Sequence, residues 1–253
     1  MDWFVKEDSI VRKIWGNADT VLLIFGGAAA EFALNKAVDW LYFTGKLPAD
    51  PIGRLFSTVT YARHIVFSSL DDANNTIDKI RMIHTSVEAK RGFSIPDWAY
   101  RDVLFMLIHY SISSFELLDR KLTDEEKEEV YDVFYRVGSR MQLKELPLNY
   151  AAWLPVYEQH LQNDLEKSKF TIDLYKQYKK HLGSVRYKIL KEAQVLVVPP
   201  KVRHLLGFDK KSLLAPVIPI YKFSALLGLD KVVKAVLLPN KYKAQIRELN
   251  IRQ

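Results

Sequence analysis

The sequence predicts an all-α fold, with one main helical bundle and a C-terminal extension of short, proline-broken helices that packs back on the bundle. Apolar residues recur with the helical period along the chain, and no segment shows the alternation that is typical of a strand. Prolines at 199, 200, 216, 219 and 239 would end any long helix in the last part of the chain. We therefore expect a single domain of 253 residues, in which 1–168 form the core bundle and 169–253 the extension.

Three helices are expected in the first ninety residues. The first runs through VLLIFGGAAAEFALNKAVDWLYF, where the pair Gly26 and Gly27 indicates either a tight helix approach or the true helix start. The second, 51–68, begins with Asp-Pro and carries an apolar stripe. The third spans about 71–90 and takes its N-cap from an aspartate of LDDANNT.

Three further helices complete the expected bundle. The segment 98–120 is apolar almost all round, which predicts a helix buried within the bundle. The segment 122–141 begins with the capping pattern Thr-x-x-Glu and is amphipathic. A sixth helix, about 152–168, follows the turn that begins at KELPLN.

The composition excludes several classes of protein. The sequence has no cysteine, which excludes disulfides, zinc–thiolate sites, iron–sulfur clusters and thiolate-ligated haem. Dinucleotide, P-loop, zincin and nucleophile-elbow motifs are missing. The N-terminus lacks a signal-peptide pattern, and the longest apolar runs are interrupted by Glu31 or by prolines and Lys222. We therefore expect a cytoplasmic protein.

Charge is distributed unevenly along the chain. Residues 1–166 carry 18 Lys+Arg and 25 Asp+Glu, a net charge of −7, whereas residues 167–253 carry 19 and 5, a net charge of +14. A basic C-terminal region can contact an anionic membrane surface, bind nucleic acid or simply aid solubility. No nucleic-acid motif accompanies it. We therefore expect no nucleic-acid partner, and we consider a peripheral membrane contact through this region.

Histidines are the natural candidate ligands in a chain without cysteine. Three of the six lie in polar sequence surroundings that predict surface positions: His160, His181 and His204. His84 differs, because Ile77, Ile80 and Val87 share its helical face and an imidazole thus replaces an apolar residue of a core stripe. His109 also lies in an apolar segment, FMLIHYSI.

The two inward histidines allow three interpretations. Each can be a core histidine that is hydrogen-bonded to a neighbouring carbonyl. Either can bind haem, because neutral imidazole is a common ligand to iron. The third is a non-haem metal site made of His84 and Glu88, at i and i+4, with His109 and Glu116.

Basic and hydroxyl side chains flank the apolar stripes of two helices. Arg54 and Thr58 are one turn apart beside the stripe of 51–68, which suggests either a salt bridge or a reactive pocket. Arg81 lies one turn before His84, in a basic cluster that can neutralise carboxylates such as haem propionates or remain solvated.

The order of these features resembles one known family. A Gly-Gly pair, DPIGRLFSTVTYARHIVF, IRMIH some thirty residues on, and HYSISSFELL follow one another. This order resembles the catalytic domain shared by bacterial rubber oxygenases (latex-clearing proteins) and the endoplasmic-reticulum-bound oxygenase of fungal mycophenolic acid biosynthesis. The resemblance covers about Leu22 to Glu166. Its most specific part combines Asp-Pro-x-x-Arg-Leu-x-x-Thr with Arg-x-x-His.

The resemblance implies a globin-like helical core that binds haem b and uses O₂ to cleave a carbon–carbon double bond. By this resemblance, His84 is the metal ligand and Arg81 is its neighbour in the cofactor-binding site. Arg54 and Thr58 match the arginine and threonine of the distal pocket. Ser111 falls about where the family has a further pocket hydroxyl.

Two positions depart from the rubber oxygenases. Ser57 stands where they have a lysine just before the pocket threonine, and Asp39 lies in the region where they have a glutamate that acts as a base. These departures favour a smaller isoprenoid, a lipid or another alkene over rubber. His109 and Lys46 are candidates for a further cofactor ligand on the distal side.

We therefore expect a haem-b-dependent oxygenase that uses O₂ to oxidise or cleave an apolar, alkene-containing substrate, isoprenoid-like or lipid-like. One alternative is a protein that binds haem or an apolar ligand without turnover. Another is a membrane-associated helical protein without the cofactor. The expected partner is a small apolar substrate, and the oligomeric state is not predicted.

Overall fold

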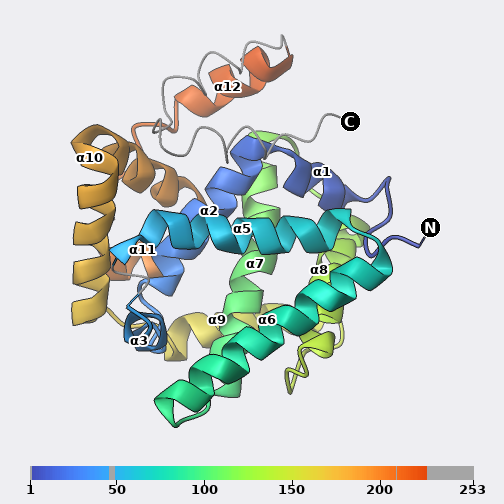
Figure 1. Ribbon diagram of the computed structural model, residues 1–253. Coiled ribbons are helices and arrows are strands. Elements are labelled where there is room, and N and C mark those ends of the chain that lie inside the picture. The colour runs from blue at the N-terminus through green and yellow to red at the C-terminus, as the bar shows by residue number, and fades with distance from the viewer. Residues whose placement is uncertain (1, 46–48, 209, 227–253) are drawn as a thin grey trace.

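The computed structural model describes residues 2–45, 49–208 and 210–226, and these residues form an all-helical fold (Figure 1). Within these ranges there is no strand. Two isolated bridges, Trp3 with Ser69 and Asn35 with Leu165, are the β-type pairings found there. The expected all-α fold is confirmed.

Most of the first helices begin with polar caps that their sequences supply. They are α1 (Ile10–Gly16), α2 (Ala18–Phe32), α3 (Asp39–Phe43), α5 (Pro51–Phe67) and α6 (Leu70–Arg91). Asn17, Asp50 and Ser69 each accept a hydrogen bond from a backbone N–H of the first turn of α2, α5 and α6. The aspartates expected to cap α6 instead lie in its first turn, where they complement the helix dipole.

The remaining helices complete the bundle. They are α7 (Asp97–Leu118), α8 (Asp124–Arg140), α9 (Tyr150–Asn163), α10 (Lys169–Val197), α11 (Pro200–Leu206) and α12 (Val217–Leu226). Thr123 and Glu126 form the expected capping box of α8, with both reciprocal hydrogen bonds present. Four of the expected helices, 51–68, 71–90, 98–120 and 122–141, are therefore reproduced to within a few residues.

One expected helix is broken into two. The first predicted helix ends at Phe32, and α3 begins only at Asp39. The break lies at Asn35, whose Oδ1 accepts a hydrogen bond from the Ala37 N–H over 2.8 Å. A side chain that satisfies the backbone locally competes with helix continuation.

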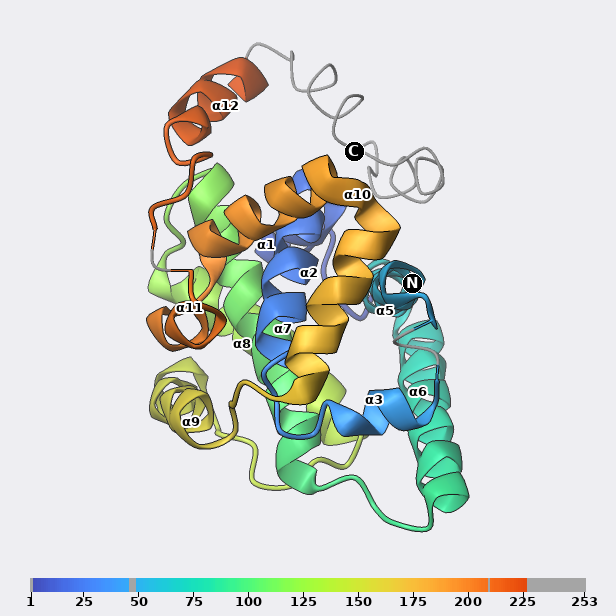
Figure 2. The same ribbon diagram turned by 90° about the vertical axis from the view of Figure 1, so that its left-hand side faces the viewer.

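The C-terminal part contains a long helix, which was not expected from the positions of the prolines. α10 runs for 29 residues before Pro199 and Pro200, and it bends at Gly183, where φ is 72° (Figure 2). The prolines do divide the chain beyond it into α11 and α12. α10 contacts α2, α5 and α7, so it packs directly on the bundle.

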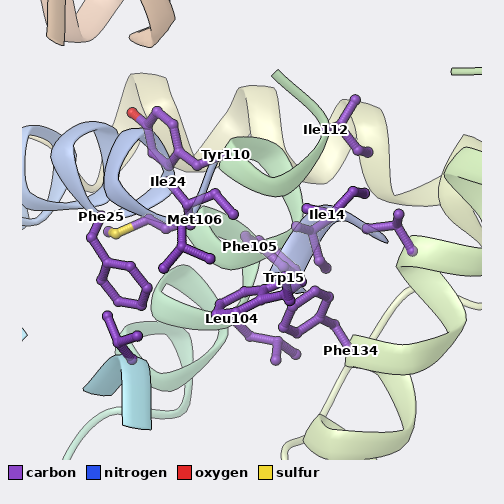
Figure 3. Packing of buried hydrophobic residues seen from close by; sticks show 14 of the residues in the cluster. Ile14, Trp15, Ile24, Phe25, Leu104, Phe105, Met106, Tyr110, Ile112 and Phe134 are labelled. Carbon is purple, nitrogen blue, oxygen red and sulfur yellow. The ribbon is translucent and has the colours of Figure 1, made fainter. Parts of the chain in front are cut away.

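α2 and α7 form the centre of the molecule. Both views show them in the middle; α5 crosses them in Figure 1, and Figure 2 shows α5 and α6 on one side and α9 and α11 on the other. A Cβ on Gly27 of α2 would lie 2.3 Å from the Tyr110 ring of α7, so the glycine allows this close approach. Buried side chains of α1, α2, α7 and α8 surround Trp15 (Figure 3).

No helix within the described ranges is both long enough and apolar enough to cross a membrane.

Candidate functional site

Arg54 and Thr58 lie on adjacent turns of α5, at the edge of its packed face. Nη1 of Arg54 donates to Oγ1 of Thr58 and to Oγ of Ser57, each over 3.2 Å. The Arg54 side chain is half-buried and has no carboxylate partner among the described residues, so the salt bridge considered above is not formed. Burial lowers the pKa of Arg54. A half-buried cation without a counter-ion is available to an anionic or polar ligand.

His84 lies on α6 close to that cation. Its ring packs on Tyr100 with 5.1 Å between centroids, and its Nδ1 is buried without a hydrogen-bond partner. Burial and the charge of Arg54 lower the pKa of His84, while Glu88 opposes this change. His84 is therefore neutral at neutral pH, which is the form of imidazole that binds a metal. The structure thus brings His84 and Arg54 together.

Arg81 lies one turn before His84 on the same helix. Its backbone carbonyl accepts a hydrogen bond from Thr85 Oγ1, but its guanidinium makes no hydrogen bond or ion pair with the described residues. The side chain is half-buried. It is therefore free to meet a carboxylate of a bound group.

Glu88 and Tyr100 support the position of the His84 ring. Glu88 Oε1 accepts from the Ile95 N–H over 2.7 Å and from the Tyr100 hydroxyl over 3.1 Å. Burial and the Glu88 charge raise the pKa of Tyr100, so its hydroxyl remains a donor. The ring that packs on His84 is thereby fixed between α6 and α7.

Asp39 is engaged in an ion pair. Its Oδ2 lies 2.6 Å from Nη2 of Arg91, and the Arg91 guanidinium lies 3.9 Å from the centre of the Trp40 ring. Asp39 is therefore not a free base in this structure.

Ser111 contacts a different part of the molecule. Its Oγ donates to the Leu107 carbonyl over 2.6 Å and accepts from Trp15 Nε1 over 3.2 Å. These contacts place it against α1, so the structure does not bring Ser111 together with Arg54 and His84. Its role in a pocket stays a prediction.

His109 also faces away from α6. Its ring stacks on Tyr157 of α9 at 4.9 Å and hydrogen-bonds to the Val197 carbonyl at the end of α10. Burial lowers the pKa of His109, and its Nε2 is buried without a partner. The bond to a carbonyl is what a core histidine would make. Lys46, the other candidate for a distal ligand, lies outside the described residues.

The non-haem grouping of His84, Glu88, His109 and Glu116 is not assembled. Glu88 is held by α7 as described, and Glu116 pairs with Lys121 and accepts from the Leu122 N–H. Among the described residues, the set of side chains that could together hold a metal ion is another one: Asp102, His160 and Asp164.

His160 was expected at the surface, and this prediction is wrong. Only 2% of its side chain is exposed, in the last turn of α9. Its Nε2 lies 3.1 Å from Oε1 of Glu31, and its Nδ1 lies 2.9 Å from Oδ1 of Asp102 and 3.4 Å from Oδ2 of Asp164. Burial opposes protonation, but Asp102 and Glu31 raise the pKa of His160 to about 10.

Glu31 is the centre of this buried cluster. Its Oε2 accepts hydrogen bonds from the hydroxyls of Tyr110 and Tyr157, each over 2.8 Å, and the residue is fully buried. Burial and the Glu31 charge raise the pKa of both tyrosines. Both hydroxyls therefore donate permanently to the carboxylate.

A signal for this cluster was present in the sequence. Trp153, Tyr157 and His160 follow at i, i+4 and i+7, so they share one helical face that reaches the core. Glu31 stands in the middle of an otherwise apolar helix. The surface prediction for His160 was wrong because it considered the residues next to it in sequence and not the residues on its helical face.

Two surface pockets lie away from Arg54 and His84. One, of about 270 Å³, is lined largely by lysines and aromatic residues of α10. The other, of about 420 Å³, lies between α10 and Leu213 and Leu214. Neither is lined by Arg54, Thr58 or His84.

Comparison with known proteins identifies the family. The family model described as ER-bound oxygenase mpaB/B'/Rubber oxygenase, catalytic domain, matches residues 12–226. No curated protein and no solved structure gives a significant match. The matched segment covers most of the chain and includes both Arg54 and His84. The chain therefore belongs to the oxygenase family that comprises the ER-bound oxygenase mpaB/B' and rubber oxygenase catalytic domains.

Proposed function

We propose that the chain is a haem-b-dependent oxygenase that uses O₂ to oxidise or cleave an apolar, alkene-containing substrate. This proposal rests on the proximity of the His84 imidazole to the Arg54 guanidinium. A neutral imidazole lies close to a half-buried arginine that has no counter-ion in the described part of the chain. In a family of oxygenases, these two groups are suited to a metal ligand and to a donor toward oxygen.

The side chains around His84 fit a haem group. The buried Nδ1 without a partner leaves the ring free of the hydrogen bond that a structural core histidine would make. The unpaired guanidinium of Arg81, one turn away, can bind a haem propionate. Haem, when bound, supplies the iron that activates O₂.

Arg54 and Thr58 would act on the oxygen that reacts. Arg54 is already held by Ser57 and Thr58, so its N–H groups are fixed before substrate arrives. Fixed donors stabilise negative charge that develops on oxygen without a cost of reorganisation. Apolar side chains of α5 and α6, such as Leu55 and Ile80, would keep water away from the alkene.

The proposed substrate is an isoprenoid-like or lipid-like alkene. Cleavage of its double bond by O₂ gives two carbonyl groups, and this balance requires no additional reductant. Ser57, in place of the lysine of rubber oxygenases, is the residue that argues against rubber itself.

A second candidate function is haem or apolar-ligand binding without turnover. Asp39 favours it, because this carboxylate is committed to Arg91 and cannot act as a base in the observed arrangement. A sensor or carrier would still need His84, but it would consume no O₂.

Turnover separates these two functions. We expect the haem-reconstituted chain to consume O₂ in the presence of an isoprenoid alkene such as squalene, with carbonyl products detected by mass spectrometry. Arg54→Ala should lower the rate on the order of a hundredfold, because it removes a fixed donor. Thr58→Val should lower the rate about tenfold.

Thr60→Val is the matched control, because Thr60 lies on the same helix with an exposed side chain. Its rate should equal that of the wild type. Equal rates for Arg54→Ala and the wild type would remove the role given to Arg54. Haem binding without O₂ consumption would support the non-catalytic function.

The proposed partners are a small apolar substrate and, through the basic region 169–253, a membrane surface. The exposed lysines of α10 would provide part of such a contact. Residues 227–253 of this region lie outside the described residues. No role in nucleic-acid binding is proposed.

A further inference from the structure

Asp102, His160 and Asp164 present three donor atoms to one point between α7 and the end of α9. Nδ1 of His160 lies 2.9 Å from Oδ1 of Asp102 and 3.4 Å from Oδ2 of Asp164, and all the donor atoms lie within 4.8 Å of one another. Ligands of a tetrahedral zinc-like ion, bound at about 2.0–2.2 Å, lie roughly 3.3 Å apart. The spacing therefore suits a shared divalent ion.

The His160 ring points an unsatisfied atom into this group. Nδ1 is buried and makes no hydrogen bond of acceptable geometry, although two carboxylate oxygens lie within 3.4 Å of it. Only 2% of the side chain is exposed, so water from bulk solvent does not satisfy the atom. A metal ion would displace the proton that these carboxylates favour on the ring and would then use the lone pair of Nδ1.

The residues behind these ligands form the supporting shell that metal-binding histidines usually have. Nε2 of His160 faces Glu31, whose other oxygen is held by Tyr110 and Tyr157. A carboxylate on the second ring nitrogen fixes the orientation and tautomer of a ligating imidazole.

The ligand Asp102 is supported in the same way. Its Oδ2 accepts from Asn35 Nδ2 over 2.9 Å, and Asn35 is itself fixed by its bond to Ala37. This leaves Oδ1 of Asp102 for the ion.

Charge also favours a divalent ion at this point. Glu31 and Asp102 are buried, and Asp164 is partly buried with 27% of its side chain exposed. These acidic side chains converge on the same buried imidazole, which favours a cation there.

We propose that Asp102, His160 and Asp164 bind a divalent transition-metal ion at a site separate from His84. One imidazole and two carboxylates suit Zn²⁺ or Mn²⁺ better than a hard ion that prefers oxygen ligands alone. The partly exposed side chain of Asp164 leaves room for water as a further ligand. The ion would join α7, the end of α9 and, through Asn35, the turn after α2.

Metal content and affinity of the full chain test this site. The purified chain is treated with a chelator, dialysed, and titrated with Zn²⁺ and, separately, with Mn²⁺ and Mg²⁺, by calorimetry and elemental analysis. We expect one Zn²⁺ or Mn²⁺ per chain, with Mg²⁺ bound far more weakly. Asp164→Asn and His160→Gln should lose this binding, and Glu31→Gln should weaken it about 10–100-fold, as loss of a supporting partner does.

Matched controls keep the test independent of folding. Glu166→Gln removes an exposed charge two residues from Asp164, and His204→Gln removes an exposed imidazole; both should bind the ion like the wild type. Asp164→Asn changes a partly exposed side chain, so its circular dichroism should match the wild type. Zn²⁺ should raise the melting temperature of the wild type but not that of Asp164→Asn.

Two results would overturn the site. One is a wild-type chain that binds none of these ions stoichiometrically. The other is equal Zn²⁺ affinity for Asp164→Asn and Glu166→Gln. His84→Ala should retain the ion, so the outcome does not depend on whether haem binds.

Discussion

Gly27 shows at the scale of one residue how the sequence sets the centre of the bundle. A side chain at this position would meet the Tyr110 ring at 2.3 Å. That ring cannot easily move, because its hydroxyl is bonded to the buried carboxylate of Glu31. At the neighbouring Gly26 the nearest atom to an added Cβ is Leu190 Cδ1, at 3.8 Å, which is an ordinary contact.

The two glycines therefore predict opposite effects of the same substitution. Gly27→Ala should lower the free energy of unfolding by about 1–3 kcal/mol, as overpacking does. Gly26→Ala should leave stability unchanged or raise it by up to about 1 kcal/mol, because alanine favours helix. Urea unfolding followed by circular dichroism measures both. Equal effects would mean that the approach of α2 to α7 is not set by Gly27.

The candidate site was only partly predictable at this scale. Periodicity placed Arg54 and Thr58 only at the edge of a core face, and His84 within an apolar stripe; it was the family resemblance that grouped the three residues. His109 was singled out on its apolar helix and Ser111 by the resemblance, but neither signal says which neighbour a buried side chain contacts. Tertiary packing placed Ser111 against Trp15 and His109 against Tyr157.

At the scale of the element, α8 is the clearest case of local sequence control. Thr123 and Glu126 exchange hydrogen bonds across its first turn, and both Nη atoms of Arg120 bond to Glu126, each over 2.6 Å. Thr123→Ala removes one half of this arrangement. It should lower the free energy of unfolding by about 1 kcal/mol, measured by urea denaturation. No measurable change would show that the cap does not contribute to stability.

The same cap predicts a dependence on pH. Hydrogen bonds from Arg120 lower the pKa of Glu126 from 4.5 to about 2. The ionised carboxylate therefore stabilises the fold above pH 4.5, and this contribution is lost as the pH falls from 4.5 toward 2. Glu126→Gln should show a shallower loss of thermal stability over that range than the wild type. Identical acid profiles would contradict this assignment.

Helix ends were predictable where a residue has a strong local effect, and not elsewhere. Asp-Pro at 50–51 and Thr-x-x-Glu at 123–126 fixed the starts of α5 and α8. At the break of the first expected helix, the Asn35 side chain bonds locally to the Ala37 N–H, and Asn35 also pairs with Leu165. That pairing is a long-range contact, which a local pattern does not contain.

At the scale of the whole molecule, α10 packs against α2, α5 and α7 of the bundle. Leu174, Tyr178 and Val197 are buried. Nε2 of Gln194 donates to the Gly26 carbonyl over 3.0 Å in the interior. The C-terminal extension thus packs back on the core through α10.

Removal of α10 should therefore disrupt the fold. A chain of residues 1–168 would expose the apolar face of α2 and α7 that α10 covers. We expect it to lose the single cooperative thermal transition of the full chain, measured by circular dichroism. A truncated chain with a cooperative transition near that of the full chain would show that 1–168 is an independent domain.

Haem uptake by the full chain tests the proposed function most directly. The apo-protein is titrated with haem while the Soret absorption is recorded for the wild type, His84→Ala, His109→Ala and the exposed control His64→Ala. We predict one haem per chain for the wild type, His109→Ala and His64→Ala, and loss of the band in His84→Ala. A wild-type chain that binds no haem, or a His84→Ala variant that binds it like the wild type, would contradict His84 as the iron ligand.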